Sequence, residues 1–417
     1  MNQIQEIIKK EEQRIREQLL MIPSENYVSK AVLQALGSVV INKYSEGQVG
    51  KRYYQGNKNI DEIEQLAKDR ALELFGLDPN EWGVNVQAVT GSIANLAVYS
   101  AMLEIGDPML SMFLYDGGHL SHGWQLPDGK KISFTSKIFK PNYYYVDLET
   151  EVFDYDKVEQ RAHEVKPKII ISGGTAYPRD LDHSRLKKIA QSVGAYYMAD
   201  IAHEAGLVAS GLLNSPFESA DVVTMTTRKT LRGPIGTIIL SRKQFSEEID
   251  RAVMPGLQGG PMNNNIAAIA VALREAMTDD FKEYSRNTIL NAKTLAEELV
   301  KLDIRVVSGG TDKHLLLIDL KENRFSGKEV AIALEKANII TNKNTIPGET
   351  STPWNPSGIR LGTPAITSRG IKVENMPQIA SWISQIIKSV EDESQLMQIA
   401  DEVRSFATDF PVPGVDD

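Results

Sequence analysis

The sequence predicts an α/β protein, with a large domain built on a mostly parallel sheet covered by helices and a smaller C-terminal α+β domain. Short apolar runs alternate with helix-like stretches from about residue 83 to 240, as in parallel strands joined by helices. After about residue 280 this alternation stops. Because 417 residues exceed what one core usually holds, we expect three parts: an N-terminal helix and interface arm at 1–60, the large domain at 61–280 and the small domain at 281–417.

The N-terminal part predicts a helix followed by a long loop. Apolar residues between Ile4 and Leu19 recur at helical spacing among Glu, Lys, Arg and Gln, which indicates an amphipathic helix. Residues 40–59 are polar and glycine-rich, include three tyrosines and show no periodicity. Ordered loops of this length are usually functional or interfacial, so we expect such a role here.

The remaining elements follow from apolar runs and helical spacing. In the large domain we expect strands at 84–87, 168–172, 195–199, 222–225 and 237–240, and helices at 60–75, from Thr90, at 155–165 and at 183–193. In the small domain we expect helices at 287–301, from Ser326 and twice near the C-terminus, with strands at 304–308 and 314–320. Ligand groups should gather at the carboxyl ends of the parallel strands.

The composition excludes several functional classes. A net charge of −9 argues against a nucleic-acid partner, because such proteins need clustered Lys and Arg. The absence of cysteine excludes disulfides, thiolate catalysis and Cys-zinc sites. The first twenty residues are too charged for a signal peptide, and no apolar run reaches membrane length. We therefore expect a cytoplasmic protein with no membrane partner.

The segment 224–237, TMTTRKTLRGPIGT, places Lys229 in a loop between two apolar runs. A lysine at the end of a buried strand, close to an arginine, can lose solvation and have its pKa lowered, and such a lysine can form a Schiff base. A solvated loop lysine is the alternative when this segment is taken alone.

Two other segments could complete a site around that lysine. Asp200 closes the run AYYMAD and precedes His203, so a carboxylate that can hold a heterocyclic nitrogen in its protonated form lies beside an imidazole. On this segment alone, a helix-capping aspartate explains the pattern equally well. Thr90-Gly91-Ser92 opens a helix with free N–H groups, hydroxyls and a positive dipole end, which suits a phosphate.

Other candidate groups are less specific. His119 and His122 lie three apart in a glycine-rich turn, but no clear third metal ligand is close in the sequence, so we predict no metal and an imidazole that can stack on a flat ring. Arg360 is a lone arginine in an apolar, glycine-flanked segment, where a carboxylate partner or a structural ion pair would explain it. No dinucleotide or P-loop motif is present.

Many short segments, in order along the chain, together resemble the serine hydroxymethyltransferase family. The resemblance covers about residues 20 to 390. The matching segments are Ser24-Glu25-Asn26, NKYSEG, GKRYY, GGHLSHG, AYPR, Asp200-x-Ala-His203, Lys229-Thr-Leu-Arg-Gly-Pro, PGLQGGP, NKNTIP and Ser-Gly-Ile-Arg360-Leu-Gly-Thr.

The resemblance implies a fold type I, aspartate aminotransferase-like enzyme that uses pyridoxal 5'-phosphate to move a one-carbon unit from serine to tetrahydrofolate, giving glycine. It implies a homodimer or a dimer of dimers with shared sites. By residue, it implies that Lys229 binds the cofactor covalently, that Asp200 pairs with the ring nitrogen and that His119 stacks on the ring. The other cofactor-binding residues would be Thr90, Gly91, Ser92, Thr175, His203 and Thr226, with Tyr44, Gly259 and Gly260 from the neighbouring subunit.

The same resemblance assigns the substrate side of the site. Arg360 and Ser24 would bind the substrate carboxylate, Glu46 would transfer a proton beside the hydroxymethyl carbon, and Tyr54 would complete the pocket from across the interface. On the folate side the expected residues are Asn344, Thr352 and Trp354.

Departures from the family pattern keep other hypotheses open. Arg228 stands where the family usually has histidine, and the sequences of residues 124–129 and 348–356 differ from those usual in the family. The alternatives are a folate-independent or substrate-shifted relative, such as a threonine aldolase, a transaldolase or an α-methylserine-type hydroxymethyltransferase, and an inactive binding subunit. Retention of Lys229, Asp200, His203, Glu46 and Arg360 argues against the last of these.

Overall fold

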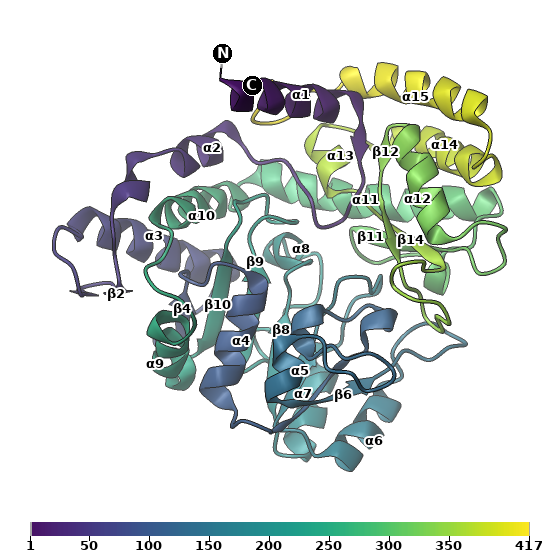
Figure 1. Cartoon of the computed structure of the whole chain (residues 1–417). Helices are drawn as coiled ribbons and strands as arrows, with labels where there is room; N and C mark the ends of the chain where they lie inside the picture. The colour runs from purple at the N-terminus through teal and green to yellow at the C-terminus, as the bar shows by residue number, and fades with distance from the viewer. Residues whose placement is uncertain (1, 417) are drawn as a thin grey trace.

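A seven-stranded sheet forms the centre of the protein, which we describe from a computed structural model over residues 2–416 (Figure 1). The strand order is β4-β10-β9-β8-β7-β5-β6. β10 runs antiparallel to β4 and β9, while the pairs from β9 to β6 are parallel, so the predicted mostly parallel sheet is confirmed. The strands are β4 Trp82–Asn85, β5 Pro108–Met112, β6 Lys140–Tyr144, β7 Ile169–Ser172, β8 Tyr196–Asp200, β9 Val222–Thr226 and β10 Thr237–Arg242.

Helices cover both faces of this sheet. Ile170 of β7 belongs to one buried apolar cluster, whereas Ile169 and Ile171 belong to a second cluster, because successive side chains of a strand point to opposite faces. The surrounding helices are α3 Lys58–Phe75, α4 Gly91–Met102, α5 Phe134–Ile138, α6 Tyr155–Val165, α7 His183–Ser192, α8 Ala205–Ala209, α9 Lys243–Arg251 and α10 Asn263–Ala276, with short turns η2 Leu114–Asp116, η3 Leu120–His122 and η4 Ala252–Leu257.

A second unit, with its own apolar cluster, contains the C-terminal part of the chain. Its antiparallel sheet has the order β11-β14-β13, and β1 of the N-terminal segment pairs in parallel with β12. The elements are β1 Leu19–Leu20, β11 Leu315–Asp319, β12 Ile339–Ile340, β13 Asn342–Asn344, β14 Gly358–Gly362, α11 Asp279–Lys301, α12 Gly327–Lys336, α13 Pro364–Ser368, α14 Met376–Lys388 and α15 Glu393–Thr408, with turns η5 Val307–Gly309 and η6 Val373–Asn375.

Helix α11 joins the two units. Phe281 and Tyr284 in its first turns belong to the apolar cluster of the large sheet, whereas Leu295 and Leu299 near its end belong to the cluster of the small unit. A continuous 23-residue helix therefore fixes the small unit against the large one.

Local sequence signals explain two outcomes in the small unit. Ser326 caps α12 as expected, with Glu329 completing a capping box. The predicted strand at 304–308 is wrong: only Val306 makes a single bridge, to Ile318, before turn η5 begins. Ser308 and Gly309 have φ values of 54° and 69°, and this left-handed backbone turns the chain out of an extended path.

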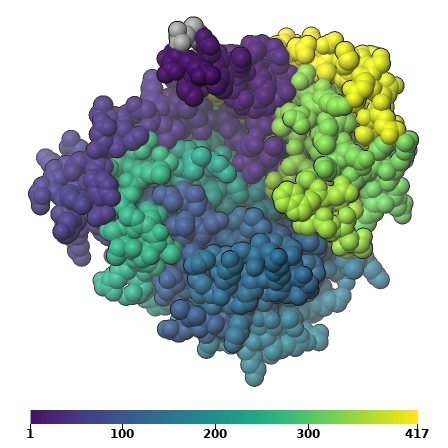
Figure 2. All heavy atoms as spheres, viewed as in Figure 1, coloured from purple at the N-terminus to yellow at the C-terminus, as the bar shows by residue number. Residues whose placement is uncertain are grey.

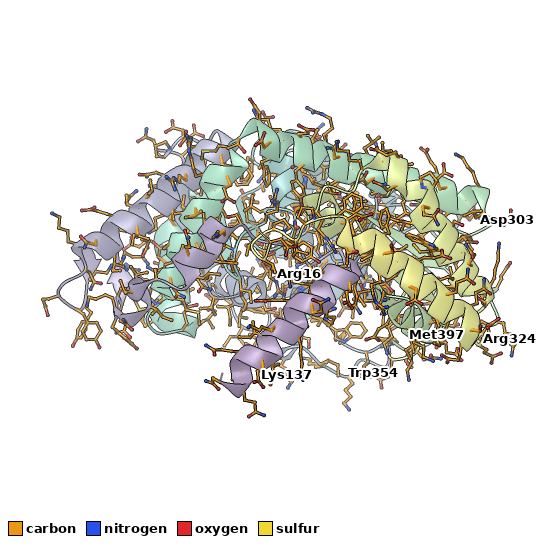
Figure 3. The ribbon with its side chains drawn as sticks, turned by 90° about the horizontal axis from the view of Figure 1, so that it is seen from above. Arg16, Lys137, Asp303, Arg324, Trp354 and Met397 are labelled. Carbon is orange, nitrogen blue, oxygen red and sulfur yellow. The ribbon has the colours of Figure 1, made fainter. Side chains whose placement is uncertain are left out.

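The N-terminal segment places helix α1 beside α15 and then extends an arm along the large unit (Figures 1 and 3). The arm contains α2 Lys30–Leu36, turn η1 Val39–Asn42 and a small hairpin of β2 Gly47–Gln48 and β3 Lys51–Arg52. Figure 2 shows it as a purple lobe at one edge of the molecule. Among residues 2–416, no helix is long and apolar enough to cross a membrane.

Candidate functional site

A cavity of about 160 Å³ lies at the carboxyl ends of β8 and β9, where the topology predicts ligand binding. It brings together residues from five separate segments of the large unit. The residues that line it are Thr90, Gly91, Ser92, His119, Gly174, Thr175, Asp200, Ala202, His203, Thr226, Arg228 and Lys229. We call this cavity the lysine pocket.

Lys229 occupies the loop between β9 and β10. Thr227 donates to the Pro234 carbonyl at 2.7 Å and Thr230 donates to the His203 carbonyl at 2.8 Å, so hydroxyls on both sides of the lysine hold the loop. The lysine is 8% exposed and makes no ion pair with any described residue. Burial lowers the pKa of Lys229 to about 8, against an opposing effect of Asp200. The buried amine is therefore neutral far more often than a surface lysine.

Asp200 is the buried carboxylate of the pocket. Its Oδ2 accepts from Asn95 Nδ2 at 2.7 Å and from His122 Nε2 at 3.0 Å, and its Oδ1 accepts from the Ala202 N–H at 3.0 Å. Burial, the largest single cause, raises the pKa of Asp200, but the hydrogen bonds from His122 and Asn95 and the charges of His122 and His119 together outweigh it and leave the pKa well below its usual range. This carboxylate stays ionised and can pair with a protonated ring nitrogen.

The N-terminus of α4 forms another wall of the pocket. Thr90 is its N-cap and accepts from the Ile93 N–H through its hydroxyl, which leaves the N–H groups of the first turn facing the cavity. A Cβ on Gly91 would approach Thr226 Cγ2 to 2.9 Å, so a larger residue there would have to displace this methyl group of the pocket wall. Free N–H groups, two hydroxyls and the helix dipole make this an anion site.

His119 and His122 have different positions. His119 lines the pocket, accepts from the Ser121 N–H at 3.1 Å through Nδ1 and has its pKa lowered to about 4 by burial. A neutral ring of this kind can lie against a flat ligand. The ligating atoms of His119, His122 and Asp200 lie within 4.8 Å of one another, which would suit a metal ion, but His122 and Asp200 are joined by a hydrogen bond and His119 Nδ1 accepts from the Ser121 N–H.

Arg360, on β14 of the small unit, reaches the wall of the lysine pocket. It donates to Asn342 Oδ1 at 3.0 Å and to the carbonyl of Thr175, a residue that lines the pocket. Only 8% of Arg360 is exposed, and no carboxylate in the described part of the chain pairs with it. Burial lowers its pKa to about 10, against a weaker effect of Glu25. A buried cation without a counter-ion is suited to an anionic ligand.

Five predicted site residues lie together elsewhere, and none of them lines the lysine pocket. Tyr44 and Tyr54 pack edge to face with ring centroids 5.3 Å apart. A Cβ on Gly259 would lie 3.6 Å from Glu46 Oε1, and a Cβ on Gly260 would lie 3.3 Å from the Tyr44 ring. The tyrosines are 56% and 40% exposed. We call this group, Tyr44, Glu46, Tyr54, Gly259 and Gly260, the arm cluster.

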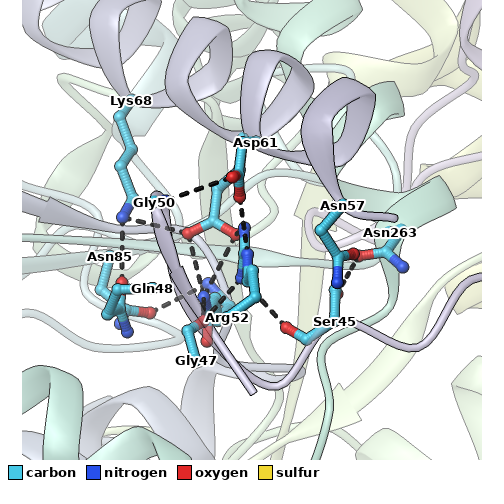
Figure 4. A network of polar contacts seen from close by, with 12 residues as sticks. Ser45, Gly47, Gln48, Gly50, Arg52, Asn57, Asp61, Lys68, Asn85 and Asn263 are labelled. Atoms are coloured by element: carbon cyan, nitrogen blue, oxygen red, sulfur yellow. Dashed lines mark hydrogen bonds and ion pairs between the residues drawn. The ribbon is translucent and has the colours of Figure 1, made fainter. Parts of the chain in front are cut away.

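A buried polar network supports the arm cluster (Figure 4). The Arg52 side chain, 3% exposed, pairs with Asp61 and with the fully buried Glu64, each at 2.7 Å, and donates to the Gly47 carbonyl at 2.6 Å. Lys68 contacts the other oxygen of Glu64 at 3.0 Å. The network ties the hairpin to α3, so the short arm is held by side chains rather than by strand pairing.

Four other predicted residues, Ser24, Asn344, Thr352 and Trp354, do not line the lysine pocket. Ser24 lines a neighbouring groove of about 490 Å³, and Arg228 lines both that groove and the lysine pocket. Asn344 lies on β13, and Thr352 is exposed in the following loop. Trp354 is 82% exposed and lies at the edge of the molecule in Figure 3, with Lys343 Nζ 5.6 Å from its ring.

Reasoning from the sequence missed several groups of the pocket. His122 was considered only as a metal ligand, although it is the partner of Asp200. Asn95, which also donates to Asp200, lies on a helix face that is otherwise apolar, and a lone amide there was an available signal. Gly174 and Ala202 line the pocket but have no side chain that could identify them.

Comparison with known proteins shows the family of this chain. A family model described as serine hydroxymethyltransferase matches residues 1–383. The serine hydroxymethyltransferase of Acidothermus cellulolyticus is 48% identical, over 99% of this chain and 96% of the relative. That of Sorangium cellulosum is 48% identical, over 99% and 95%, and the mitochondrial protein of Candida glabrata is 45% identical, over 98% and 92%. The chain belongs to the serine hydroxymethyltransferase family.

Proposed function

We propose that this protein catalyses the reversible, pyridoxal phosphate-dependent transfer of the serine hydroxymethyl carbon to tetrahydrofolate, giving glycine and methylenetetrahydrofolate. The observation that supports this best is a buried amine without a counter-ion, Lys229, in one cavity with an ionised Asp200 and the N-terminus of α4. Family membership supports the same reaction.

The residues of the lysine pocket fit pyridoxal phosphate in three ways. An aldehyde needs a neutral amine, and burial keeps Lys229 neutral more often than usual. A phosphate needs N–H donors and a positive dipole, which the first turn of α4 provides. A pyridinium nitrogen needs a carboxylate, and Asp200 is ionised and buried. Of these groups Lys229, which has no counter-ion among the described residues, would be the costly one to bury without such a ligand.

When bound, the cofactor supplies an aldehyde that joins the substrate amine and a ring that withdraws electrons from the substrate α-carbon. In our proposal Lys229 binds this cofactor and exchanges protons near the α-carbon, while Asp200 keeps the ring nitrogen protonated. His119 would lie against the ring, and Thr175 and His203 would hold the ring oxygen. Thr90, Gly91, Ser92 and Thr226 hold the phosphate side.

The substrate carboxylate binds Arg360 in this proposal, with Ser24 assisting. Support comes from the missing counter-ion of Arg360 and from its contact with Thr175 at the pocket wall. Glu46 moves a proton at the hydroxymethyl oxygen as the carbon–carbon bond breaks, and Tyr54 closes the site around it. Both belong to the arm cluster, so we propose that a second chain delivers them, together with Tyr44, Gly259 and Gly260.

We further propose a homodimer, or a dimer of dimers, and a cytoplasmic location. The exposed tyrosines of the arm support an interface at this surface, because contiguous exposed apolar groups usually mark one. On the folate side we propose Asn344, Thr352 and Trp354, because Trp354 offers an exposed aromatic face close to β13. The division into parts at 1–60, 61–280 and 281–417 also stays a proposal.

The test is glycine formation from serine by the purified protein, with and without tetrahydrofolate, measured beside acetaldehyde release from threonine. We expect glycine formation to depend on tetrahydrofolate and to exceed threonine cleavage. Serine cleavage that is independent of tetrahydrofolate, or a preference for threonine, would refute the proposed reaction.

A further inference from the structure

Two adjacent residues of the large unit face two adjacent residues of the small unit directly behind the lysine pocket. His203 Nδ1 lies 3.2 Å from His314 Nε2, and Lys313 Nζ lies 2.7 Å from Glu204 Oε1. All four are buried, with His314 and Lys313 0% and 2% exposed. His203 lines the pocket, whereas the other three residues do not.

Both imidazole rings of this group are neutral. Burial is the main cause that moves the pKa of His203 and of His314 well below 6.5, and nearby cations act in the same direction: Lys229 and Arg360 on both rings, and Lys313 on His314. A neutral imidazole has one N–H and one bare nitrogen. One proton must therefore lie between His203 Nδ1 and His314 Nε2, and the ring that donates it fixes the tautomers of both rings.

The outer nitrogen of His314 decides between the two arrangements. His314 Nδ1 is buried and has no hydrogen-bond partner among the described residues. If His203 Nδ1 donated the shared proton, the proton of His314 would lie on that Nδ1, as a buried N–H without an acceptor. If His314 Nε2 donates, Nδ1 is a bare aromatic nitrogen. Orphaned N–H donors are the rarer and costlier of the two in folded proteins.

We propose that His314 is a positioning residue that fixes the tautomer of His203: His314 Nε2–H donates to His203 Nδ1, so that His203 has its proton on Nε2, the nitrogen left for the lysine pocket. The role of this N–H group toward the cofactor rests on the proposed function. An N–H donor at this wall fits an unprotonated oxygen on the cofactor ring, and it favours that anionic oxygen over a hydroxyl.

The ion pair between Glu204 and Lys313 holds the two histidines in register. It joins the neighbour of each histidine, and Lys313 Nζ also lies 5.5 Å from the centre of the Tyr177 ring. On the other side, Thr230 donates to the His203 carbonyl at 2.8 Å and accepts from the Gly206 N–H at 3.1 Å, which links the group to the loop of Lys229. Outer-shell contacts of this kind are what set the orientation and tautomer of a functional histidine.

The experiment reads the tautomer directly by ¹⁵N NMR of the full-length protein labelled only at histidine, with and without pyridoxal phosphate. The chain has six histidines, so each can be assigned by single substitution. With and without the cofactor, we expect the ¹⁵N chemical shifts of His203 to be those of an unprotonated Nδ1 and a protonated Nε2. A protonated Nδ1 at His203 would overturn the proposal, whatever reaction the enzyme catalyses, because the measurement needs no substrate.

Two variants extend the test. His314→Gln keeps an N–H donor and His314→Phe keeps a ring without one. We expect His314→Gln to retain the His203 tautomer, and His314→Phe to yield a mixture with about tenfold weaker pyridoxal phosphate binding by fluorescence titration. An unchanged tautomer in folded His314→Phe would refute the role of His314. If that variant fails to fold, the wild-type spectrum and His314→Gln decide.

Discussion

The lysine pocket and the arm cluster are built in opposite ways, although both contain predicted site residues. In the pocket, Lys229, Asp200 and His203 are less than 9% exposed and lie at or just after the ends of five-residue parallel strands. In the arm cluster, Tyr44 and Tyr54 are 56% and 40% exposed and flank a hairpin whose strands have two residues each. The pocket is a cavity within the chain, whereas the arm cluster forms a surface.

The difference shows that a preorganised group need not be a buried one. The arm hairpin is too short to be stable by itself, yet Arg52, Asp61 and Glu64 fix it with buried ion pairs. A protein gains nothing from fixing exposed tyrosines in this way unless something binds them. In our proposal the ligand of this surface is the lysine pocket of a second chain, and the following experiments test that relation.

The largest effect is expected inside the lysine pocket. Lys229→Ala should lower turnover about 10⁴-fold or more, because the variant loses both the covalent link and the proton-transfer group. The melting temperature of the cofactor-free protein should stay constant or rise, because a buried amine without a counter-ion is removed. The exposed Lys293→Ala is the matched control. A variant that keeps a tenth of the activity would exclude Lys229 from catalysis.

The second experiment joins the two regions across subunits. Heterodimers of a Lys229→Ala chain and a Glu46→Gln chain, purified through two different tags, should recover about half of the wild-type activity. In a two-fold symmetric dimer with shared sites, one site then has both defects and the other has neither. Each homodimeric variant should be nearly inactive. Heterodimers as inactive as their parents would mean that Glu46 acts within its own chain.

Reasoning from the sequence predicted the pocket better than the arm, for a physical reason. Lys229 and Asp200 follow apolar runs, and the carboxyl ends of parallel strands meet at one edge, so their proximity follows from the fold class. His122 and Asn95 were missed because their contact with Asp200 depends on how η3 and α4 pack against β8, which no local pattern encodes.

The same limit applies to the arm and to the connections between units. Residues 40–59 were expected to be an ordered loop, but the hairpin there is held by Arg52 and Glu64, which are ordinary charged residues in the sequence. The strand expected at 304–308 failed because the left-handed backbone at Ser308 and Gly309 outweighs apolar spacing. The periodicity of apolar residues therefore contains no information on which side chains pair or on where the backbone φ angle is positive.

The third experiment removes the support of the arm cluster. Arg52→Met should destabilise the protein by about 3–5 kcal/mol, because Glu64 then stays buried with only Lys68 as a charged partner. Arg161→Met, which breaks an exposed pair with Glu164, should change stability by less than about 1 kcal/mol. Both are measured by urea unfolding. If the two variants lose equal stability, the buried network is not what holds the arm.

The smallest effect is expected from a change of pH. This fourth experiment tests whether the lysine pocket is preorganised before the arm of a second chain covers it. Burial lowers the pKa of Lys229 to about 8, so its neutral, nucleophilic fraction grows with rising pH and levels off above that value. Capture of pyridoxal phosphate by the cofactor-free protein, followed by absorbance, should accelerate about tenfold per pH unit below pH 8 and then reach a plateau. The measurement covers pH 7 to 10, where the phosphate group, with its second pKa near 6, stays nearly constant in charge. A free lysine side chain, as in an acetylated lysine amide, should reach its plateau only near its ordinary pKa of about 10.4. Capture by the protein that kept accelerating to pH 10 would mean that the amine is solvated until a second chain covers it.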